Sequence, residues 1–515
     1  MSTLQFFDEK ANTFLNGRQV VGKCPFENCS SEKAYADECD LGHQYMPQEL
    51  INPISTLTGN KPVLKEISNW YFNLQDNKDL LIKWIEYLEK ETITRPYITK
   101  EIKEFLKEPE VYIKKDYDEI LNKIKSSLPR FYQIEDNKSS RTIVFESLSD
   151  REKACDILTK NGIRYRTGKT LVPFRLTGNI SWGVPVPNEK DLTFWVWPES
   201  LWAPISFTKT YLKNSSNPTK DWKDWWCSKD SSIFQFIGED NIYFYGPAQH
   251  AIWFNMQKGN PTVDVSNGSL QISTLVANKH LLFLNQKASS SSKVKPPMAD
   301  ELLKYYTAEQ LRAHFLGLNL GNNSASFMPK MFNPDAAENE VDIVLKEGNL
   351  LTNVYNKVLR TLFYAWQKYF DGVVPFGEVS ENVLKNSVKT ILKCEKLMAS
   401  TKFHMVTYEL DTYIRGINKH WISSFEEGNL EKIKQSIIDC LHMSKVAMVL
   451  LHPIAPDSCE KLADFLKLDK SVFSWEKIEK PIYEFVENKE KYIPNFLEPK
   501  QDFFKKHPSQ FKGED

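Results

Sequence analysis

The 515-residue sequence contains no long uninterrupted apolar segment and no recognisable leader. It has no run of eighteen apolar residues, the length that indicates a transmembrane helix. The first residues, MSTLQFFDEKANTF, form neither a basic and apolar signal sequence nor an arginine-rich transit segment. We therefore expect a soluble globular protein of the cytoplasm.

Cysteine is sparse, and neither sign of charge dominates. Eight cysteines in so long a chain are too few for a disulfide scaffold and fit a reducing compartment. The formal net charge of -1 argues against nucleic-acid binding through bulk charge, but it does not exclude a local basic face. With 41% apolar residues, a chain of this length can bury several cores, which predicts three or four domains.

The most distinctive stretch runs from Ile180 to Tyr245 and contains the pieces ISWGVPVP, FWVWPESLWAPISF and FIGEDNIYFY. Each piece has the pattern of a buried strand that leads into a loop. Glu239 and Asp240 follow Gly238, and an open α/β sheet presents ligand-binding groups at such a strand end. An aspartate there suits ribose hydroxyls, and Trp197 suits a small flat or apolar ligand. A tryptophan-rich core beside a solvated acid is the alternative interpretation.

Near the N-terminus, three cysteines and a histidine have the spacing Cys-x4-Cys-x9-Cys-x3-His. Two close pairs separated by a short loop are what a tetrahedral zinc site requires. The spacing of both pairs is unusual, so chance is the alternative. We predict a structural zinc knuckle with the ligands Cys24, Cys29, Cys39 and His43.

The central pieces resemble methionyl-tRNA synthetases, which have a W-G-V-P-V-P run, a V-W-x-D-A-P-I-G-Y loop and an F-x-G-K-D-N-x-x-F-H strand in this order. The similarity extends over nearly the whole chain, through FFDE, ELINP, PVLKEISNWYF and RPYITKEIKEFLKE near its start and KASSSSKVK later. It implies ancestry in this class I family. It also implies a nucleotide and amino-acid pocket with Gly238, Asp240, Trp197 and Tyr245, and a mobile phosphate-binding loop with Lys287 and Lys293.

Several positions depart from the family's pattern. The first half of the nucleotide-binding fold, with its His-Ile-Gly-His tetrapeptide, has no room before Gln5. Gly178 stands where the family has an arginine, and Ser290 replaces the second lysine of the mobile loop. Asn353 and the pair Glu426-Glu427 replace residues that read the anticodon, and acids near a phosphate backbone repel it. We therefore expect a divergent paralogue for which tRNA is a doubtful ligand.

The predicted fold class is α/β followed by all-α, with a partial Rossmann-like catalytic domain. We expect a tight hairpin turn at Asn16-Gly17 and a surface extension at the C-terminus. Helical spacing of apolar residues from Asp342 onward indicates an antiparallel bundle. The predicted segments are a connective domain with the zinc knuckle (1–108), a small inserted α/β segment (109–178), the C-terminal half of the catalytic domain (179–330), a helical bundle like those that bind anticodons (331–492) and a tail (493–515).

Two functions fit these observations, and the sequence alone leaves enzymatic activity uncertain. The chain could be a component of an ATP-dependent enzyme that forms aminoacyl adenylates, with a separate protein partner for the missing half-site and an acceptor other than tRNA. In that case it would bind ATP and magnesium besides zinc, and an amino acid as substrate. Alternatively, it could be a catalytically inactive pseudoenzyme that serves as a binding or scaffold subunit. Neither hypothesis involves a membrane.

Overall fold

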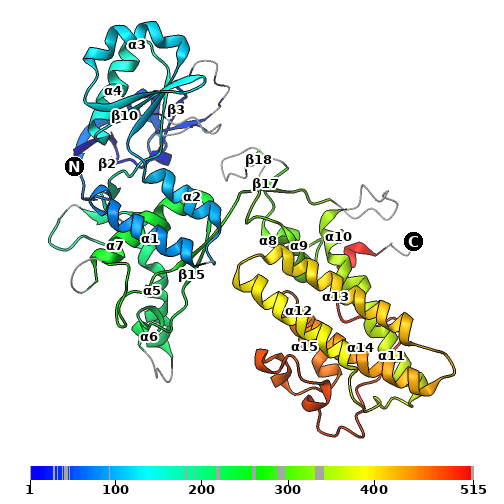
Figure 1. Ribbon diagram of the computed structural model, residues 1–515. Coiled ribbons are helices and arrows are strands. Elements are labelled where there is room, and N and C mark those ends of the chain that lie inside the picture. The colour runs from blue at the N-terminus through cyan, green and yellow to red at the C-terminus, as the bar shows by residue number, and fades with distance from the viewer. Residues whose placement is uncertain are drawn as a thin grey trace. The chain divides into compact units, whose positions relative to one another are not determined.

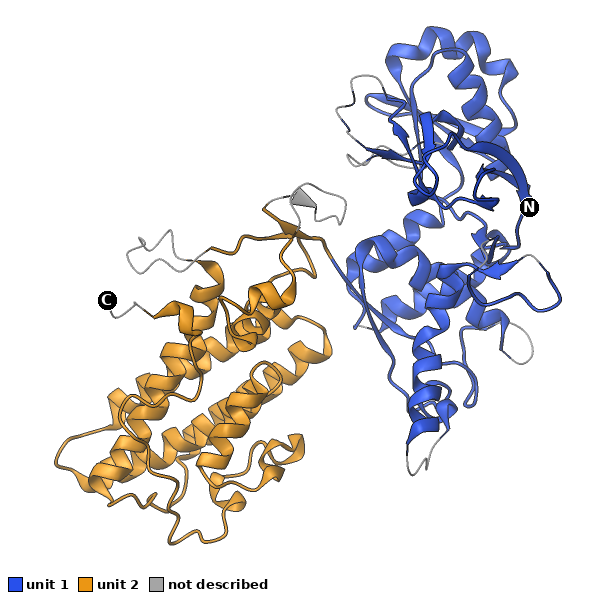
Figure 2. Cartoon of the chain, turned by 180° about the vertical axis from the view of Figure 1, so that it is seen from behind, with its two compact units in different colours: residues 1–278 blue, residues 279–515 orange. Residues whose placement is uncertain are grey.

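The computed structural model describes residues 2–511, except for 27–28, 30, 32, 37–38, 40–44, 46, 92, 180–181, 191, 216–220, 258–261, 285, 288–295 and 331–341. The chain divides into two compact units, Met1–Asn278 and Lys279–Asp515 (Figure 2). The finer division into five segments stays a prediction. In the part of the chain that is described, no helix has both the length and the apolar composition needed to span a bilayer.

The first unit begins with two three-stranded antiparallel sheets, in the orders β2-β1-β6 and β4-β3-β5. The turn between the first two strands lies at Asn12, which has a left-handed φ of 50°. The predicted hairpin turn at Asn16-Gly17 is therefore wrong, because the Asn16 side chain instead caps a short 3-10 helix. The strands are β1 (Ser2–Asp8), β2 (Thr13–Phe14), β3 (Val20–Lys23), β4 (Ala34–Tyr35), β5 (Ile51–Ser55) and β6 (Val63–Ser68).

A small α/β element follows, with a four-stranded antiparallel sheet in the order β11-β8-β10-β9. Both of its helices pack on one sheet face through a shared apolar core (Figure 1). The α/β character that the sequence predicts for this segment is confirmed, and its second helix ends just before Gly162, whose φ is +70°. The elements are β8 (Glu110–Lys114), α3 (Asp118–Ile124), β9 (Phe131–Asp136), β10 (Ser140–Phe145), α4 (Leu148–Lys160) and β11 (Tyr165–Thr167).

The rest of the first unit surrounds a core of buried aromatic and aliphatic side chains, centred on Trp84 and Phe254. Its strands are short, and only β15 and β16 form a parallel pair. The elements are β7 (Tyr71–Phe72), α1 (Lys78–Lys90), α2 (Pro96–Phe105), β12 (Phe174–Arg175), β13 (Thr177–Gly178), β14 (Thr193–Phe194), α5 (Val196–Asn214), α6 (Trp222–Trp226), β15 (Phe234–Gly238), α7 (Gln249–Asn255) and β16 (Thr274–Asn278).

One of the three predicted strand-and-loop pieces is confirmed and two are not. FIGEDNIYFY forms β15 followed by a turn, as predicted. Most of FWVWPESLWAPISF is helix α5, because its buried residues Pro198, Leu201 and Ile205 recur at helical spacing. In ISWGVPVP the described residues form no named strand, and Pro185 makes only an isolated bridge to Thr193.

The second unit opens with a three-stranded sheet in the order β18-β17-β19 and three helices before the bundle. Tyr306 and Phe327 belong to a small buried cluster at this sheet. The boundary between the units falls between β16 and β17. The elements are β17 (Leu281–Phe283), β18 (Gln286–Lys287), α8 (Ala299–Leu302), α9 (Ala308–Gly317), β19 (Ala325–Phe327) and α10 (Ile343–Asn349).

The predicted helical bundle is confirmed, and it encloses one continuous core (Figure 1). Helix α14 is its central element, since every residue from Ser436 to Leu451 is buried. The predicted surface extension at the C-terminus is wrong as far as the chain is described, because Leu497, Phe503 and Phe504 are buried in this core. The helices are α11 (Asn356–Tyr369), α12 (Glu381–Ala399), α13 (Phe403–Ser424), α14 (Leu430–Leu451) and α15 (Pro456–Phe465).

Candidate functional site

The carboxyl ends of β15 and β16 form the candidate ligand-binding edge of the first unit. The two strands pair in parallel, and Gly238 lies opposite Asn278 in the last register position. Glu239 and Asp240 follow at once in a 3-10 turn, with Asp240 exposed. A Cβ at Gly238 would lie 2.6 Å from Asp240 Oδ1, so the glycine leaves room for this carboxylate. The strand end and acid predicted from the sequence are thus in place.

An aromatic cluster lies against the segment that follows β15. The Trp197 ring, in the first turn of α5, stacks on the Phe244 ring with 3.6 Å between centroids and 4° between planes. Tyr245 meets the same indole edge-on at 6.5 Å. The structure therefore brings Trp197 to the segment that carries Gly238 and Asp240. Because Phe244 covers one face of Trp197, a ligand could reach only the rest of this side chain.

Two residues at this edge were missed by the sequence analysis. Arg95 Nη1 donates hydrogen bonds to the carbonyl oxygen of Ala277 (2.5 Å) and to Asn278 Oδ1 (3.0 Å). The Tyr97 hydroxyl donates to the same carbonyl. Burial lowers the pKa of the Arg95 guanidinium and raises the pKa of Tyr97 to about 12. Both side chains come from the start of α2, about 180 residues before β16, so no local spacing could have identified them.

One departure from the family's pattern is Gly178, where the family resemblance leads us to expect an arginine. A Cβ at this position would lie 2.9 Å from the ring of Trp195, so a larger residue requires this ring to move. The guanidinium of Arg175 lies over the same ring, 4.5 Å from its centroid, and its Nε donates to the Thr177 carbonyl oxygen at 2.7 Å. With the Trp195 ring in this position the packing fits glycine at 178, and another arginine, Arg175, lies three residues earlier.

Three of the four predicted metal ligands come together in the N-terminal sheets. The sulfur atoms of Cys24, Cys29 and Cys39 all lie within 4.8 Å of one another. Cys24 and Cys39 are buried, and Cys29 is half-buried. The fourth predicted ligand, His43, lies outside the described residues. The donor set of three thiols is the one that structural zinc sites prefer.

The predicted phosphate-binding lysines lie in the second unit. Lys287 is the last residue of β18, and the backbone of this strand pairs with β17. The Lys287 side chain and all of Lys293 lie outside the described residues. Two histidines outside these sites pack against aromatic rings: His250 is fully buried against Trp84, which lowers its pKa to about 4, and His452 stacks on Phe473.

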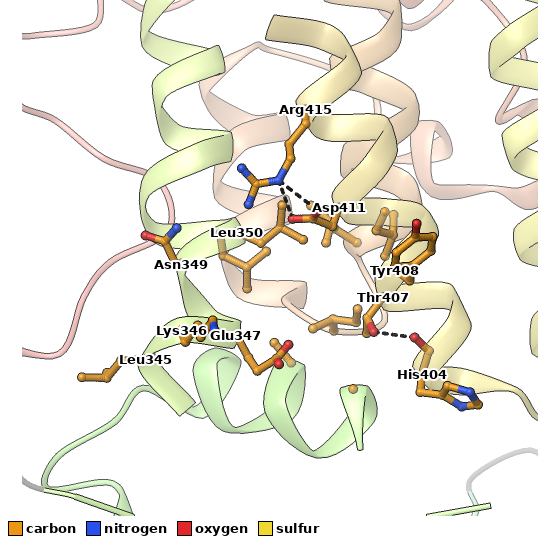
Figure 3. A pocket seen from close by; sticks show the side chains of 16 residues that line it. Leu345, Lys346, Glu347, Asn349, Leu350, His404, Thr407, Tyr408, Asp411 and Arg415 are labelled. Carbon is orange, nitrogen blue, oxygen red and sulfur yellow. Dashed lines mark hydrogen bonds and ion pairs between the residues drawn. The ribbon is translucent and has the colours of Figure 1, made fainter. Parts of the chain in front are cut away.

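The second unit contains a cavity of about 620 Å³ beside Asn349, at the end of α10 (Figure 3). Asp411 accepts two hydrogen bonds from Arg415 Nε, both 2.9 Å, on the α13 side of the cavity. Glu347 is exposed, although partial desolvation by its surroundings raises the pKa of its carboxyl, and it makes no hydrogen bond or ion pair with any residue that the structure describes. Asn353, which replaces the expected arginine, donates to the Asn349 side-chain oxygen.

The structure of Mycobacterium tuberculosis methionyl-tRNA synthetase bound to methionyl-adenylate superposes with a TM-score of 0.54 at 14% identity, over 98% of this chain and 77% of that one. The fold is thus that of a class I aminoacyl-tRNA synthetase of the methionyl type. The family model described as tRNA synthetases class I (M) matches residues 1–119 and 150–355. The chain belongs to this family. Residues 120–149, which the match omits, fall within the predicted insertion.

Individual relatives agree with this assignment. Methionine–tRNA ligase of Bacteroides fragilis is 25% identical over 488 residues, 92% of this chain. That of Wigglesworthia glossinidia brevipalpis is 24% identical over 528 residues, which is 99% of this chain and 77% of the relative. The chain spans about 58% of the length of the Bacteroides protein.

These relatives overturn the predicted set of partners. The family and the relatives carry tRNA in their names, and the relatives match 92% and 99% of this chain, while the family model matches residues 1–119 and 150–355. The prediction that tRNA is a doubtful ligand is therefore wrong. It rested on Asn353 and Glu426-Glu427, but substitutions at three surface positions do not outweigh a match of this extent. None of these matches supports the predicted separate protein partner.

Proposed function

We propose that this protein acts as a methionyl-type aminoacyl-tRNA ligase, in which the first unit holds the aminoacyl adenylate and the second unit binds tRNA. The observation that carries the proposal is the strand edge at Gly238 and Asp240, with Trp197 beside it. An exposed carboxylate after a parallel strand suits the two ribose hydroxyls of an adenosine. The indole and Tyr245 supply an apolar wall for the amino-acid side chain.

In this proposal, separate groups of the chain would bind the ribose, fix the strand ends and neutralise the phosphate charge of the adenylate. The Asp240 carboxylate would accept hydrogen bonds from the ribose hydroxyls, and its approach depends on the missing side chain at Gly238. Arg95 and Tyr97 fix the end of β16 through the Ala277 carbonyl, and so keep the two strand ends in register. The lysines of 287–295 would neutralise charge on the transferred phosphate groups.

The second unit supports the tRNA half of the proposal through the cavity beside Asn349. Its lining combines an amide, the exposed carboxylate of Glu347 and the Tyr408 side chain (Figure 3). Sequence-specific RNA recognition uses such side chains on unstacked bases, because amides and carboxylates match the polar edges of bases and aromatic rings stack on them.

The experiment measures binding of a non-hydrolysable methionyl-adenylate analogue to the full chain. Asp240→Asn is expected to weaken binding about 10- to 100-fold, because a hydrogen bond to a charged group contributes about 1.5–3 kcal/mol. Asp230→Asn, in the exposed turn before β15, is the matched control and is expected to change nothing. Equal binding by wild type and Asp240→Asn would contradict this assignment of the ribose site.

An inactive tRNA-binding protein is the second candidate function, and the packing at Gly178 favours it. The ring of Trp195 fills the space that an arginine would need, so the charge expected there is absent. ATP–pyrophosphate exchange with methionine separates the two candidates. Exchange above background supports the ligase, whereas tRNA binding without exchange supports the inactive protein.

We also propose a structural zinc ion at Cys24, Cys29 and Cys39, with His43 as the fourth ligand. Two buried thiols and one half-buried thiol within 4.8 Å of one another support it. The same three residues belong to the buried cluster of the N-terminal sheets, so the ion would stabilise this region rather than take part in chemistry.

A further inference from the structure

A second large cavity of the second unit lies between α12 and α13 and has a different character from the one beside Asn349. Its volume is about 620 Å³. Its walls are the facing sides of the two helices, and Met443 of α14 contributes to its floor. We call it the α12–α13 groove. The lining residues of α13 run from Glu409 to Ser423, a length of about 21 Å at 1.5 Å per residue.

The groove carries an excess of positive charge. Lys389 and Lys393 line it from α12, and Lys419 lines it from α13, while His420 on the same wall is hydrogen-bonded to the buried Asp439 at 3.2 Å. Its one acidic lining residue, Glu409, is neutralised by Lys393 at 2.5 Å. Within the described part of the chain, neither Lys389 nor Lys419 forms a hydrogen bond or an ion pair. Two lysines on opposite walls are thus available to an anionic ligand.

The remaining lining residues favour phosphate groups over bases. Asn386 and Thr390 add polar groups beside the lysines, and both kinds of side chain bind phosphate oxygens. The lining aromatic residue, Tyr413, is 7% exposed, and its hydroxyl is hydrogen-bonded to Ser387 at 2.7 Å. It therefore offers no ring face on which a base could stack. At Gly416 no atom lies within 4 Å of the position of a Cβ, so the α13 wall is open there.

We propose that the α12–α13 groove binds the phosphate backbone of RNA, and that Lys389 and Lys419 each contact a phosphate group. The inference rests on the proposed function for its ligand, which is then tRNA. The cavity beside Asn349 is proposed to contact bases, whereas the groove would contact phosphate groups and so position the RNA independently of its sequence. The groove is long enough to follow several successive phosphates of one strand.

The test measures the affinity of the full chain for a transcript of elongator methionine tRNA at several salt concentrations. Each phosphate contact contributes about 0.7–0.9 to the slope of log K against log salt concentration. For K389Q/K419Q we expect a slope lower by about 1.4–1.8 and clearly weaker binding. K389R/K419R is expected to keep the wild-type slope, since it retains both charges.

The matched control is K396Q/K402Q, which removes two exposed lysines of the same unit that do not line the groove. It is expected to keep the wild-type slope. If wild type binds the transcript and K389Q/K419Q has an unchanged slope, the groove proposal is overturned while the proposed function stands. If wild type binds no transcript, both fail. Protection of α12 and α13 from hydrogen exchange by inorganic phosphate, without any RNA binding, would overturn the RNA assignment.

Discussion

The two units of this chain are stabilised in different ways. The second unit encloses one large continuous apolar core beside a small cluster at its sheet, and the central helix α14 of the large core is buried on every side over its last four turns. The first unit distributes its buried residues over three separate clusters beneath short strands. A helix bundle gains stability from a single long core, whereas small sheets need local support. The candidate ligand-binding edge lies in the first unit, where loops and strand ends can carry polar groups.

The largest expected effect is a loss of stability in the N-terminal sheets of the first unit. If Cys24, Cys29 and Cys39 hold zinc, then Cys39→Ser weakens binding of the ion and chelation removes it, and zinc binding as a whole contributes about 10 kcal/mol or more in small zinc peptides. We expect faster hydrogen exchange throughout β1–β6 and no change in the bundle. Metal analysis is expected to give about one zinc per wild-type chain.

Cys155→Ala is the control, because this buried cysteine lies in α4 and outside the thiol group. It is expected to retain the metal. Purified wild type with no bound zinc, or unchanged exchange in β1–β6 after Cys39→Ser, would contradict the zinc proposal.

The next prediction compares a core leucine from each unit. Leu441 of α14 is 2% exposed, and Leu158 of α4 is fully buried. Each change to alanine is expected to cost about 2–5 kcal/mol, as buried leucines generally do. For Leu441→Ala we expect faster exchange in all bundle helices, because they share one core. For Leu158→Ala we expect faster exchange only within α3, α4 and β8–β11.

These regional patterns are measured by hydrogen exchange of the full chain. Faster exchange at β15 and β16 in Leu158→Ala would show that the clusters of the first unit do not unfold separately. A response limited to α14 in Leu441→Ala would contradict the single cooperative core.

The same difference decides what could be predicted from the sequence. The bundle was predictable because apolar residues at helical spacing do not depend on distant partners. The strand before Gly238 and its following acids were predictable from local turn chemistry. Helix α5 was not, since Pro198 and Pro204 suggest a loop while its burial pattern is helical. Arg95 was missed because its role depends on contact with Ala277, 182 residues away.

A smaller effect is expected from the buried Lys445 of α14. Its side chain is 1% exposed, donates to the Ile478 carbonyl oxygen and lies 5.6 Å from the centroid of the Phe485 ring. Burial lowers its pKa to about 7, against the attraction of Glu479 and Glu484. The unfolded chain therefore binds one more proton than the folded chain between about pH 7 and 10, so stability rises with pH there.

For wild type we expect the Lys445 ammonium to raise the free energy of unfolding by at most about 1.4 kcal/mol per pH unit between pH 7 and 10. Lys445→Met removes the contribution, so its stability relative to wild type is expected to be highest at pH 6 and to decline toward pH 10. Urea unfolding, followed by the exchange protection of α14, measures this difference. A constant difference between pH 6 and 10 would mean that Lys445 does not titrate in this range.

The smallest predicted effect compares one helix cap in each unit. The Ser147 hydroxyl accepts a hydrogen bond from the Asp150 amide at 3.1 Å, and the Thr307 hydroxyl accepts one from the Gln310 amide at 3.2 Å. Replacing either residue by alanine is expected to cost about 1 kcal/mol.

In the first unit, Ser147→Ala is expected to speed hydrogen exchange only in α4 and its small sheet. In the second unit the Thr307 backbone amide donates a reciprocal hydrogen bond to Gln310 Oε1, and Gln310 Nε2 donates to Gln510 Oε1, so Thr307→Ala is expected to affect the C-terminal segment as well. Exchange rates near Gln510 that are identical in wild type and Thr307→Ala would show that even the larger core transmits no effect from a single cap.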